Sequence, residues 1–245
     1  MLRNCVWLSV VVVSLSTLAS AGTIVAPINK LGDLGFSLQQ VIAAGGIQVG
    51  DKVFDLFSVD NSFPTGDGPG LDDIRVYGVQ INGELGLRFI GGWSAVRGEE
   101  LDTVIGFRVT ANSPWLISDN SLGMDNFDAR NGGLVSITEN VFAAEPRPAF
   151  GGGPAPFLAS KSVFYANRAE KNLLDHEEYS DEYRPVAFPQ VWVTKDITVK
   201  GGSCEGGFAG LSQFYQTFSQ IPEPASMALL ALGGLMVLAR KNRRG

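Results

Sequence analysis

Through the middle of the chain, hydrophobic and polar residues alternate with a period of two. Ile105, Phe107 and Val109 alternate with smaller or polar residues, and similar runs recur from about residue 52 to residue 218. A period of two places every second side chain on one face of a β-strand; Phe54 and Leu56 are therefore expected to share a face. Many short strands joined by glycine-rich turns predict an all-β fold, an antiparallel β-sandwich of jelly-roll-like type, with its last strand over residues 208–218.

Two short stretches within this pattern predict local detail. Asn82-Gly83 separates two alternating runs, which is a strong signal for a two-residue hairpin turn. Val76 and Val79 belong to runs that are out of phase by one residue. Gly78 lies at that shift, so we expect a β-bulge there.

One short N-terminal helix is predicted before the strands begin. Ser37 and Gln40 have the spacing of a capping box, and Gly45-Gly46 follows as a stop signal. Farther on, residues 145–156 are rich in proline and glycine and predict an exposed loop, after which strand-like sequence resumes at Ser162. Residues 167–183 are polar and acidic and predict a short helix or another long loop.

The first 21 residues have the three parts of a secretory signal peptide. Arg3 supplies a positive charge, residues 6–18 are largely apolar, and Ala19 and Ala21 supply the small side chains that signal peptidase requires. This order predicts an N-terminal signal helix, cleavage after Ala21 and export. A buried N-terminal helix or strand is the alternative interpretation.

A second apolar segment, residues 225–239, contains fifteen residues without a charged side chain. As a helix it would span about 22 Å, which is less than the roughly 30 Å hydrocarbon core of a membrane. However, a basic cluster follows it, and such clusters stay on the cytoplasmic side. That cluster consists of Arg240, Lys241, Arg243 and Arg244. We therefore expect a C-terminal membrane helix and a membrane-anchored precursor.

These features divide the chain into three predicted parts. Residues 1–21 form the signal peptide, residues 22–221 the β-sandwich domain, and residues 222–245 a C-terminal segment with its apolar helix at 225–239 and its basic tail at 240–244. The whole chain has a formal net charge of −6. The two end segments together hold five basic residues and one acidic residue, so the domain between them is more acidic still. It should repel nucleic acid, and no nucleic-acid partner is expected.

Cysteine usage and catalytic residue types are both sparse. Cys5 lies in the signal peptide, so Cys204 is alone in the mature protein and no internal disulfide can form. His176 is the single histidine, which excludes a His-Glu-x-x-His zinc site, and no Gly-x-Ser-x-Gly sequence presents a nucleophile. Nothing in the sequence positions Cys204 and His176 as a dyad. We expect no enzyme activity, no cofactor and no metal site.

Two binding features remain open alternatives to this expectation. Acidic and amide side chains crowd one Gly- and Pro-rich stretch, where their oxygens suit calcium but also suit ordinary turns. These are Asp60, Asn61, Asp67, Asp72 and Asp73. Tryptophan rings can stack on sugars, although core packing is their commoner role. Trp115 is the tryptophan that we expect to be exposed, whereas Trp93 is expected in the core.

The C-terminal end resembles the PEP-CTERM sorting signal that exosortases read. Three parts carry the resemblance: Pro222-Glu223-Pro224, the apolar run, and the basic cluster that ends in Arg243-Arg244. The resemblance implies membrane retention, cleavage near Pro222-Glu223-Pro224 by an exosortase-like membrane protease, and delivery to the cell envelope or exopolysaccharide matrix. Prolines keep this backbone extended and accessible to a protease. A glycosylphosphatidylinositol signal fits less well, because the basic residues follow the apolar tail.

Parts of the middle region also resemble a group of PEP-CTERM domain proteins. The similar segments are residues 86–94, 102–107 and 195–197. This resemblance implies a location and a sandwich fold but no activity. The sequence as a whole predicts an exported, non-enzymatic structural or adhesive protein of the cell surface, the exopolysaccharide matrix or a biofilm. The alternative is a carbohydrate-binding module with an extracellular polysaccharide as its partner, assisted by calcium or by tryptophan; a hydrolase of matrix polymers is the third hypothesis.

Overall fold

The structure, a computed structural model, describes residues 22–29, 34–62, 68–146, 156–168, 171–175 and 187–223. Several predicted features lie outside these residues and stay predictions. They are the signal peptide with Ala19 and Ala21, Asp67, His176, Pro224, the apolar segment 225–239, and the basic residues Arg240, Lys241, Arg243 and Arg244. Among the helices of the described ranges, none has the length and apolar character to cross a membrane.

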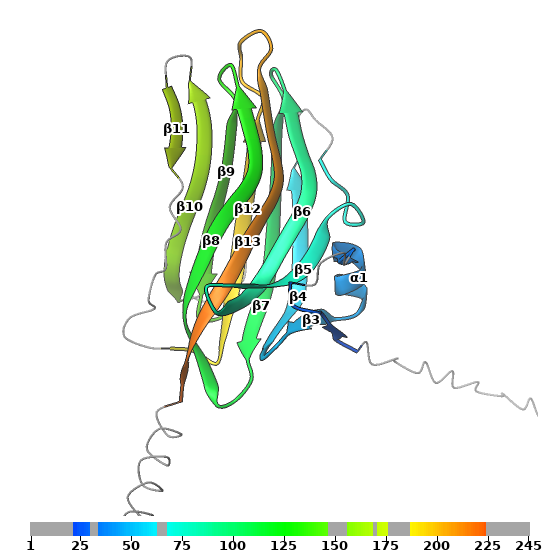
Figure 1. The fold of residues 1–245 in the computed structure, drawn as a ribbon, viewed down its shortest axis with the longest axis vertical. Helices are drawn as coiled ribbons and strands as arrows, with labels where there is room; N and C mark the ends of the chain where they lie inside the picture. The colour runs from blue at the N-terminus through cyan, green and yellow to red at the C-terminus, as the bar shows by residue number, and fades with distance from the viewer. Residues whose placement is uncertain are drawn as a thin grey trace, which may run out of the picture.

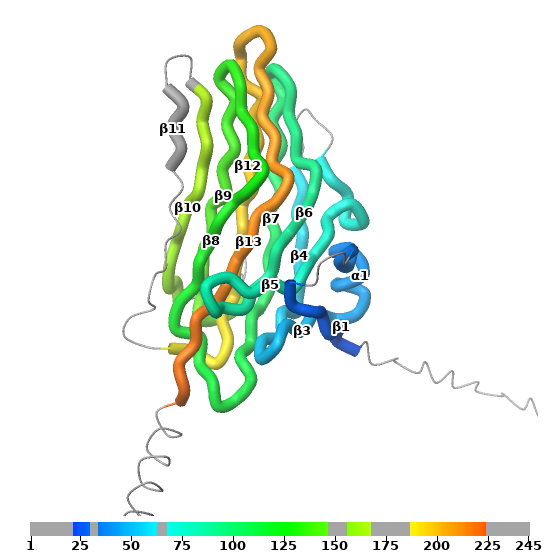
Figure 2. The backbone as a smooth tube through the Cα atoms, in the orientation of Figure 1, coloured from blue at the N-terminus to red at the C-terminus, as the bar shows by residue number. Residues whose placement is uncertain are grey.

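Two β-sheets face each other in a sandwich, as Figures 1 and 2 show. The eight-stranded sheet has the order β1 (Ile24–Val25), β3 (Gly46–Val49), β4 (Lys52–Ser62), β7 (Glu100–Ala111), β12 (Gln190–Lys200), β9 (Leu134–Phe142), β10 (Phe157–Arg168), β11 (Lys171–Asp175). The five-stranded sheet has the order β2 (Phe36–Ser37), β5 (Arg75–Ile81), β6 (Glu84–Val96), β13 (Phe208–Pro222), β8 (Trp115–Arg130). Neighbouring strands are antiparallel except β1 and β3, so the predicted antiparallel sandwich is confirmed.

The hydrophobic core fills the space between the two sheets, because alternate residues of each strand point inward. Aromatic rings form its centre: Phe89 stacks on Phe214 with ring centroids 4.9 Å apart, and the Trp93 ring lies 5.7 Å from that of Phe214. Trp93 is 1% exposed, and its indole N–H donates to Thr103 Oγ1 at 3.3 Å. The core role predicted for Trp93 is confirmed.

Local sequence signals for the helix and the hairpin are also confirmed. Helix α1 (Leu38–Ala43) begins with a complete capping box, in which the Gln40 amide donates to Ser37 Oγ at 3.2 Å and the Ser37 amide donates to Gln40 Oε1 at 2.8 Å. Between β5 and β6, Asn82 and Gly83 have φ angles of 51° and 91°. Positive φ at both central residues is what a type I′ turn requires.

Two predictions about strand phase are wrong. Leu56 has a φ of 53° and lies where the pairing of β4 with β7 shifts register, so its side chain is 58% exposed while Phe54 is fully buried. Conversely, β5 and β6 pair regularly through Gly78, where a bulge was expected. Glycine is suited to that position because a Cβ there would lie 3.1 Å from the main-chain oxygen of Pro27.

Three element boundaries differ from the sequence prediction. Strand β10 begins at residue 157 rather than at Ser162, and residues 171–175 form β11 against β10 rather than a loop or helix. Strand β13 begins at Phe208 as predicted but continues four residues beyond Phe218, because it pairs with β8 as far as Trp115. The predicted loop at 145–156 lies largely outside the described residues.

Two carboxylates lie close together on the outer face of the eight-stranded sheet. Asp102 is on β7 and Asp196 is on β12, and the Asp102 Oδ1 atom is buried without a hydrogen-bond partner among the described residues. Burial, followed by the nearby charge of Asp196, raises the pKa of Asp102. A carboxyl group whose pKa is raised by folding destabilises the folded state when it is ionised. That penalty disappears as the pH falls through the folded-state pKa toward the unfolded value.

We predict that Gly86→Ala strongly destabilises the domain, whereas Gly92→Ala on the same strand does not. A Cβ at Gly86 would lie 1.8 Å from the Gln216 main-chain oxygen, while a Cβ at Gly92 meets nothing within 4 Å. Overpacking of this kind costs roughly 3 kcal/mol, against less than about 0.5 kcal/mol for an open surface position. Denaturant unfolding of both variants measures the difference; equal stabilities would contradict the close approach of β6 to β13.

We predict that Asp102→Asn unfolds at a higher temperature than the wild type at neutral pH. The substitution removes a charge that burial, and then the neighbouring Asp196, disfavour, and this penalty exists only while Asp102 is ionised. The advantage should therefore shrink as the pH falls through the folded-state pKa of Asp102. Thermal unfolding at neutral and acidic pH tests this, and a difference that does not change with pH would contradict it.

Candidate functional site

The sorting residues at the end of the domain belong to its last strand. Pro222 is the final residue of β13 and pairs with Trp115, and the Glu223 amide donates to the Pro114 main-chain oxygen at 2.8 Å. In Figure 1 this end of β13 lies at the lower end of the sandwich. The segment predicted for cleavage therefore begins with no linker after the last strand. The processing roles of Pro222 and Glu223 stay predictions.

A buried lysine attaches this strand end to the other sheet. Lys52 on β4 is 1% exposed, and its Nζ lies 3.1 Å from Asp51 Oδ1 and 3.0 Å from Gln220 Oε1. Gln220 Nε2 in turn donates to Asp51 Oδ2. Burial lowers the pKa of Lys52, while Asp51 opposes that shift. These three side chains hold the end of β13 against β4, only two residues before the Pro-Glu-Pro sequence.

The residues considered for calcium do not form a metal site in the described part of the chain. No group of three or more His, Cys, Asp or Glu side chains in those ranges is placed to hold a metal ion. Asp72 instead accepts a hydrogen bond from Ser37 Oγ at 3.2 Å, and Asp73 accepts one from the Gly70 amide at 3.2 Å. Asp60 and Asn61 lie near the end of β4. For Asp72 and Asp73 the turn interpretation accounts for the acidic side chains.

Cys204 and Trp115, considered from the sequence as a reactive thiol and an exposed ring, differ in how far they are buried. Cys204 is a free cysteine and is exposed. Trp115 is half-buried and packs against the core, so the expectation that it is the exposed tryptophan is wrong. Its place beside the end of β13 makes it part of the lower rim of the sandwich.

Trp192 is also half-buried, but its ring lies on an outer face of the sandwich. Its neighbours Val191 and Val193 point into the core, so the indole ring lies on the outer face of the eight-stranded sheet. Cross-strand pairing places it in one row with Asp55 and Arg108. Arg108 donates two hydrogen bonds to the Asp55 carboxylate, Nε to Oδ1 at 2.8 Å and Nη2 to Oδ2 at 2.6 Å. The Arg108 Cζ atom lies 5.8 Å from the Trp192 ring centroid.

A groove of about 150 Å³ adjoins this row, and we call it the Trp192 groove. Its lining includes Leu56, Ser58, Gly106, Pro146, Trp192 and Thr194. The exposed Leu56 forms part of its wall because of the bulge in β4. Gly106 lets the Ser58 hydroxyl lie close to the backbone of β7, because a Cβ at this position would lie 2.5 Å from Ser58 Oγ. The groove therefore offers an aromatic ring and small hydroxyl side chains, and the paired Asp55 and Arg108 lie beside it in the row of Trp192. Groups of these kinds orient a polar ligand.

The sequence could have shown that Trp192 points outward, but not that Asp55 and Arg108 form a pair beside it. The alternation of Val191, Trp192 and Val193 indicates that the ring points away from the core. The bidentate pair between Asp55 and Arg108 could not be predicted, because it depends on which strands pair and in what register. The two residues are 53 positions apart in the sequence.

A second hollow, of about 370 Å³, lies at the upper end of the sandwich, opposite the sorting segment. Glycines of three turns line it, together with Glu100 and Lys200, which form an ion pair at 2.7 Å. No aromatic side chain is among its lining residues. The hollow is therefore less suited to sugar rings than the Trp192 groove.

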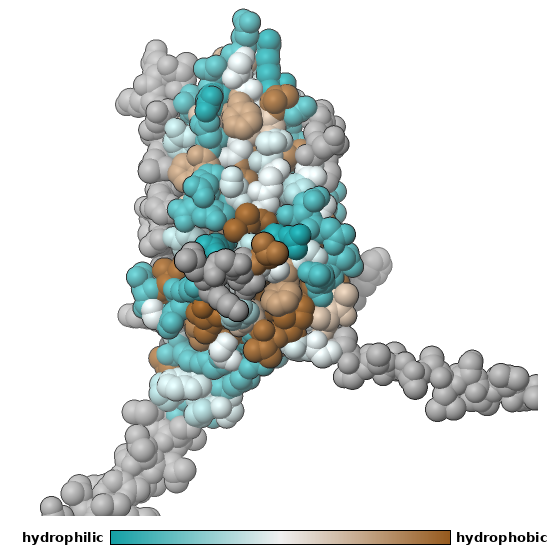
Figure 3. Space-filling model, turned by 45° about the vertical axis from the view of Figure 1, so that its right-hand side comes forward, coloured by the Kyte–Doolittle hydropathy of each residue, from teal (hydrophilic) through white to brown (hydrophobic). Residues whose placement is uncertain are grey.

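Figure 3, turned by 45° from the view of Figure 1, shows hydrophobic side chains gathered in the lower half of the molecule. Val25, Ile28 and Leu34 are exposed hydrophobic residues of the N-terminal part of the domain. Exposed apolar surface can mark a contact with another protein or a membrane. No polar group on these three residues would select a particular ligand, so we do not place the candidate site here.

Comparison with solved structures gives similarities too weak to carry any argument about what the chain binds. TmCBM61 in complex with beta-1,4-galactotriose is 15% identical with a TM-score of 0.28, and the match covers 66% of this chain and 88% of that one. The enzymatically active domain of tailspike protein 4 from bacteriophage CBA120 is 13% identical with a TM-score of 0.25, over 70% and 20% of the chains. A family two carbohydrate esterase from Cellvibrio japonicus is 17% identical with a TM-score of 0.20, over 69% and 36%.

Sequence comparison is informative at the C-terminus. No curated protein matches the chain. The PEP-CTERM protein-sorting motif, however, matches residues 220–244. The matched range begins at Gln220, which is the residue that Asp51 and Lys52 hold at the end of β13. The match confirms the resemblance seen in the sequence: the chain carries a PEP-CTERM protein-sorting motif, which implies export and sorting by an exosortase.

Proposed function

We propose that this chain is a non-enzymatic adhesive protein of the cell surface or extracellular matrix, and that it binds polysaccharide in the Trp192 groove. The row of Asp55, Arg108 and Trp192 on the outer face of the eight-stranded sheet carries the proposal. The sorting motif supports a place at the envelope, where extracellular polysaccharide is the abundant polymer.

The side chains of the groove match the chemistry of a sugar. A pyranose ring has an apolar face of C–H bonds, which packs on an aromatic ring, and a rim of hydroxyl groups, which need both donors and acceptors. Arg108 supplies only donors and Asp55 only acceptors. Their bidentate contact fixes both side chains before a ligand arrives, so little side-chain entropy is lost on binding.

Beyond the groove, the outer face of the eight-stranded sheet carries a row of small polar side chains. Ser58, Gly106, Thr194, Asn140 and Ser160 are successive cross-strand neighbours on β4, β7, β12, β9 and β10. With neighbouring strands about 4.8 Å apart, this row is roughly 19 Å long. Several linked sugar units could lie along it, so the groove would hold one unit of a longer chain.

We predict that Trp192→Ala abolishes retention of the protein by polysaccharide extracted from the matrix of the producing cells. Loss of the aromatic ring should weaken binding tenfold or more, about 1.4 kcal/mol. Affinity electrophoresis of the full chain in detergent measures it, with Thr198→Ala as the control, since Thr198 lies on the same face of β12 away from the groove. A wild-type protein that is not retarded would contradict the proposal and favour a purely structural role; so would a retarded Trp192→Ala protein.

We predict that replacing Arg240, Lys241, Arg243 and Arg244 together by Gln prevents correct sorting. Without the positive charges, the tail loses the preference that keeps it on the cytoplasmic side of the membrane. Cell fractionation and the size of the protein on an immunoblot report the outcome, with Arg130→Gln in the exposed part of the domain as the matched control. Normal processing of the fourfold variant would show that the basic tail has no role in sorting.

A further inference from the structure

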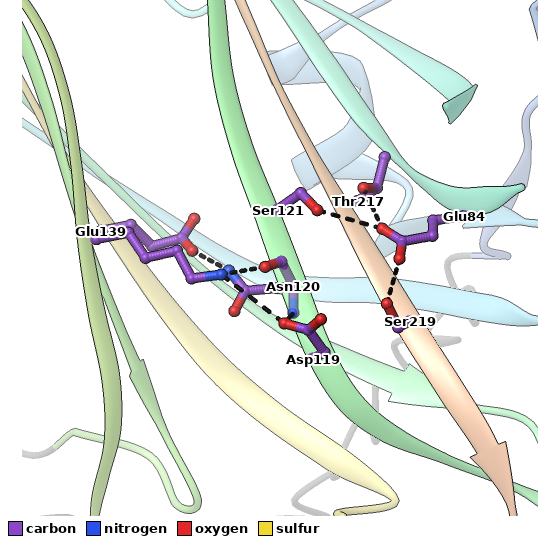
Figure 4. Close-up of polar contacts among 8 residues, drawn as sticks. Glu84, Asp119, Asn120, Ser121, Glu139, Thr217 and Ser219 are labelled. Carbon is purple, nitrogen blue, oxygen red and sulfur yellow. Dashed lines mark hydrogen bonds and ion pairs between the residues drawn. The ribbon is translucent and has the colours of Figure 1, made fainter. Parts of the chain in front are cut away.

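Five polar side chains lie together inside the sandwich, in a core that is largely apolar. We call them the core ionic cluster: Asp119 and Asn120 on β8, Glu139 on β9, Lys161 on β10 and Lys195 on β12. Glu139, Lys195 and Asn120 are 0% exposed, Lys161 is 3% exposed and Asp119 is 8% exposed. Figure 4 shows Glu139 on one side of this cluster and Asp119 and Asn120 of the facing strand β8 on the other.

The contacts in this cluster centre on one carboxyl group and one carboxamide. Lys161 and Lys195 are the cross-strand partners of Glu139 on its two sides. Lys195 Nζ donates to Glu139 Oε2, and Asn120 Nδ2 donates to Glu139 Oε1. Lys161 Nζ donates to the main-chain oxygen of Asn120 and lies 3.9 Å from Asp119 Oδ1. Glu139 therefore touches the carboxamide of Asn120, and the amine of Lys161 touches the same residue.

Burying these charged groups costs folding free energy that their ion pairs alone do not obviously recover. Desolvating charges costs several kcal/mol per ion, and apolar replacements of buried ion pairs are often equally stable or more so. Burial lowers the pKa of Lys195 even though Glu139 opposes the shift, so this part of the core disfavours an ammonium group. A core with this property favours the neutral amine, which is the nucleophilic form of lysine.

We propose that Lys161 and Asn120 form an intramolecular amide bond, with Glu139 as the proton-transfer group. The lysine Nζ attacks the Asn120 Cγ, and a new Cγ–Nζ bond forms. Glu139 accepts a proton from Nζ and delivers one to Nδ2, the Cγ–Nδ2 bond breaks, and ammonia leaves. Nothing is oxidised or reduced, and Glu139 ends in the protonation state in which it began. Lys195 is a positioning residue that holds Glu139 through its second oxygen.

Such a bond would give this exported domain the covalent cross-link that its cysteines cannot supply. The single cysteine of the predicted mature chain is exposed. The amide would join β8 of the five-stranded sheet to β10 of the eight-stranded sheet, across 41 positions of the sequence. A cross-link of this span restricts the unfolded chain much as a disulfide does.

Intact mass spectrometry of the denatured full chain tests the proposal. The expected mass lies about 17 Da below that of the sequence between the observed termini, because one ammonia is lost. Peptide mapping should find the peptides containing Asn120 and Lys161 joined. The variants Lys161→Arg, Asn120→Ala and Glu139→Gln should have the full mass. Lys52→Arg is the control, since Lys52 is a buried lysine outside the cluster and its replacement should keep the loss.

Several outcomes would overturn this proposal. A wild-type chain of full mass would do so, and so would a joined peptide that contains Lys195 in place of Lys161. A loss of ammonia without any joined peptide would also overturn it, since cyclisation at Asn82-Gly83 gives the same mass change. The wild-type measurement needs no variant to fold. Where Lys161→Arg does fold, we expect its Tm to be about 10 °C lower than that of the wild type.

Discussion

The pairing of β13 with β6 on one side and β8 on the other is the interaction on which the rest of this structure depends. It places Phe214 and Phe218 in the core, where both are almost completely buried. It carries Gln220 to Lys52 of the opposite sheet. It ends at Pro222, inside the matched sorting motif. Because no linker separates the last strand from the motif, the folded domain and its sorting signal share residues, and cleavage within β13 would remove part of the fold.

Much of the fold follows from local sequence. Period-two alternation, the Asn82-Gly83 turn and the Ser37 capping box each describe short-range chemistry, and each is present in the structure. The bulge at Leu56 could not be predicted, because a change in backbone phase leaves no distinct composition in the sequence. Strand β11 was missed because its sequence, Lys-Asn-Leu-Leu-Asp, has no period-two alternation, and its structure depends on pairing with β10. Such features depend on partners that are distant along the chain.

The candidate sites likewise divide into those that local sequence predicts and those that depend on strand pairing. The sorting motif was recognisable because its three parts are contiguous. Trp192 could have been placed on an outer face by alternation alone, but its meeting with Arg108 and Asp55 depends on strand register. The core ionic cluster left a clearer signal: Glu139 follows Ile137 and precedes Val141 at inward positions, and Lys195 lies in the same way between Val193 and Ile197. A charged residue at an inward position of a strand indicates a partner in the core.

The C-terminal end of the mature protein tests the central claim most directly, namely that β13 and the sorting motif form one unit. The measurement is C-terminal peptide sequencing by mass spectrometry of protein recovered separately from membrane and matrix fractions of the producing cells. The account predicts a matrix species that ends within Pro222-Glu223-Pro224, with all of Phe208–Ile221 retained. A mature species that ends before Gln220, or one found only in membranes with Arg243 and Arg244 still present, would contradict it.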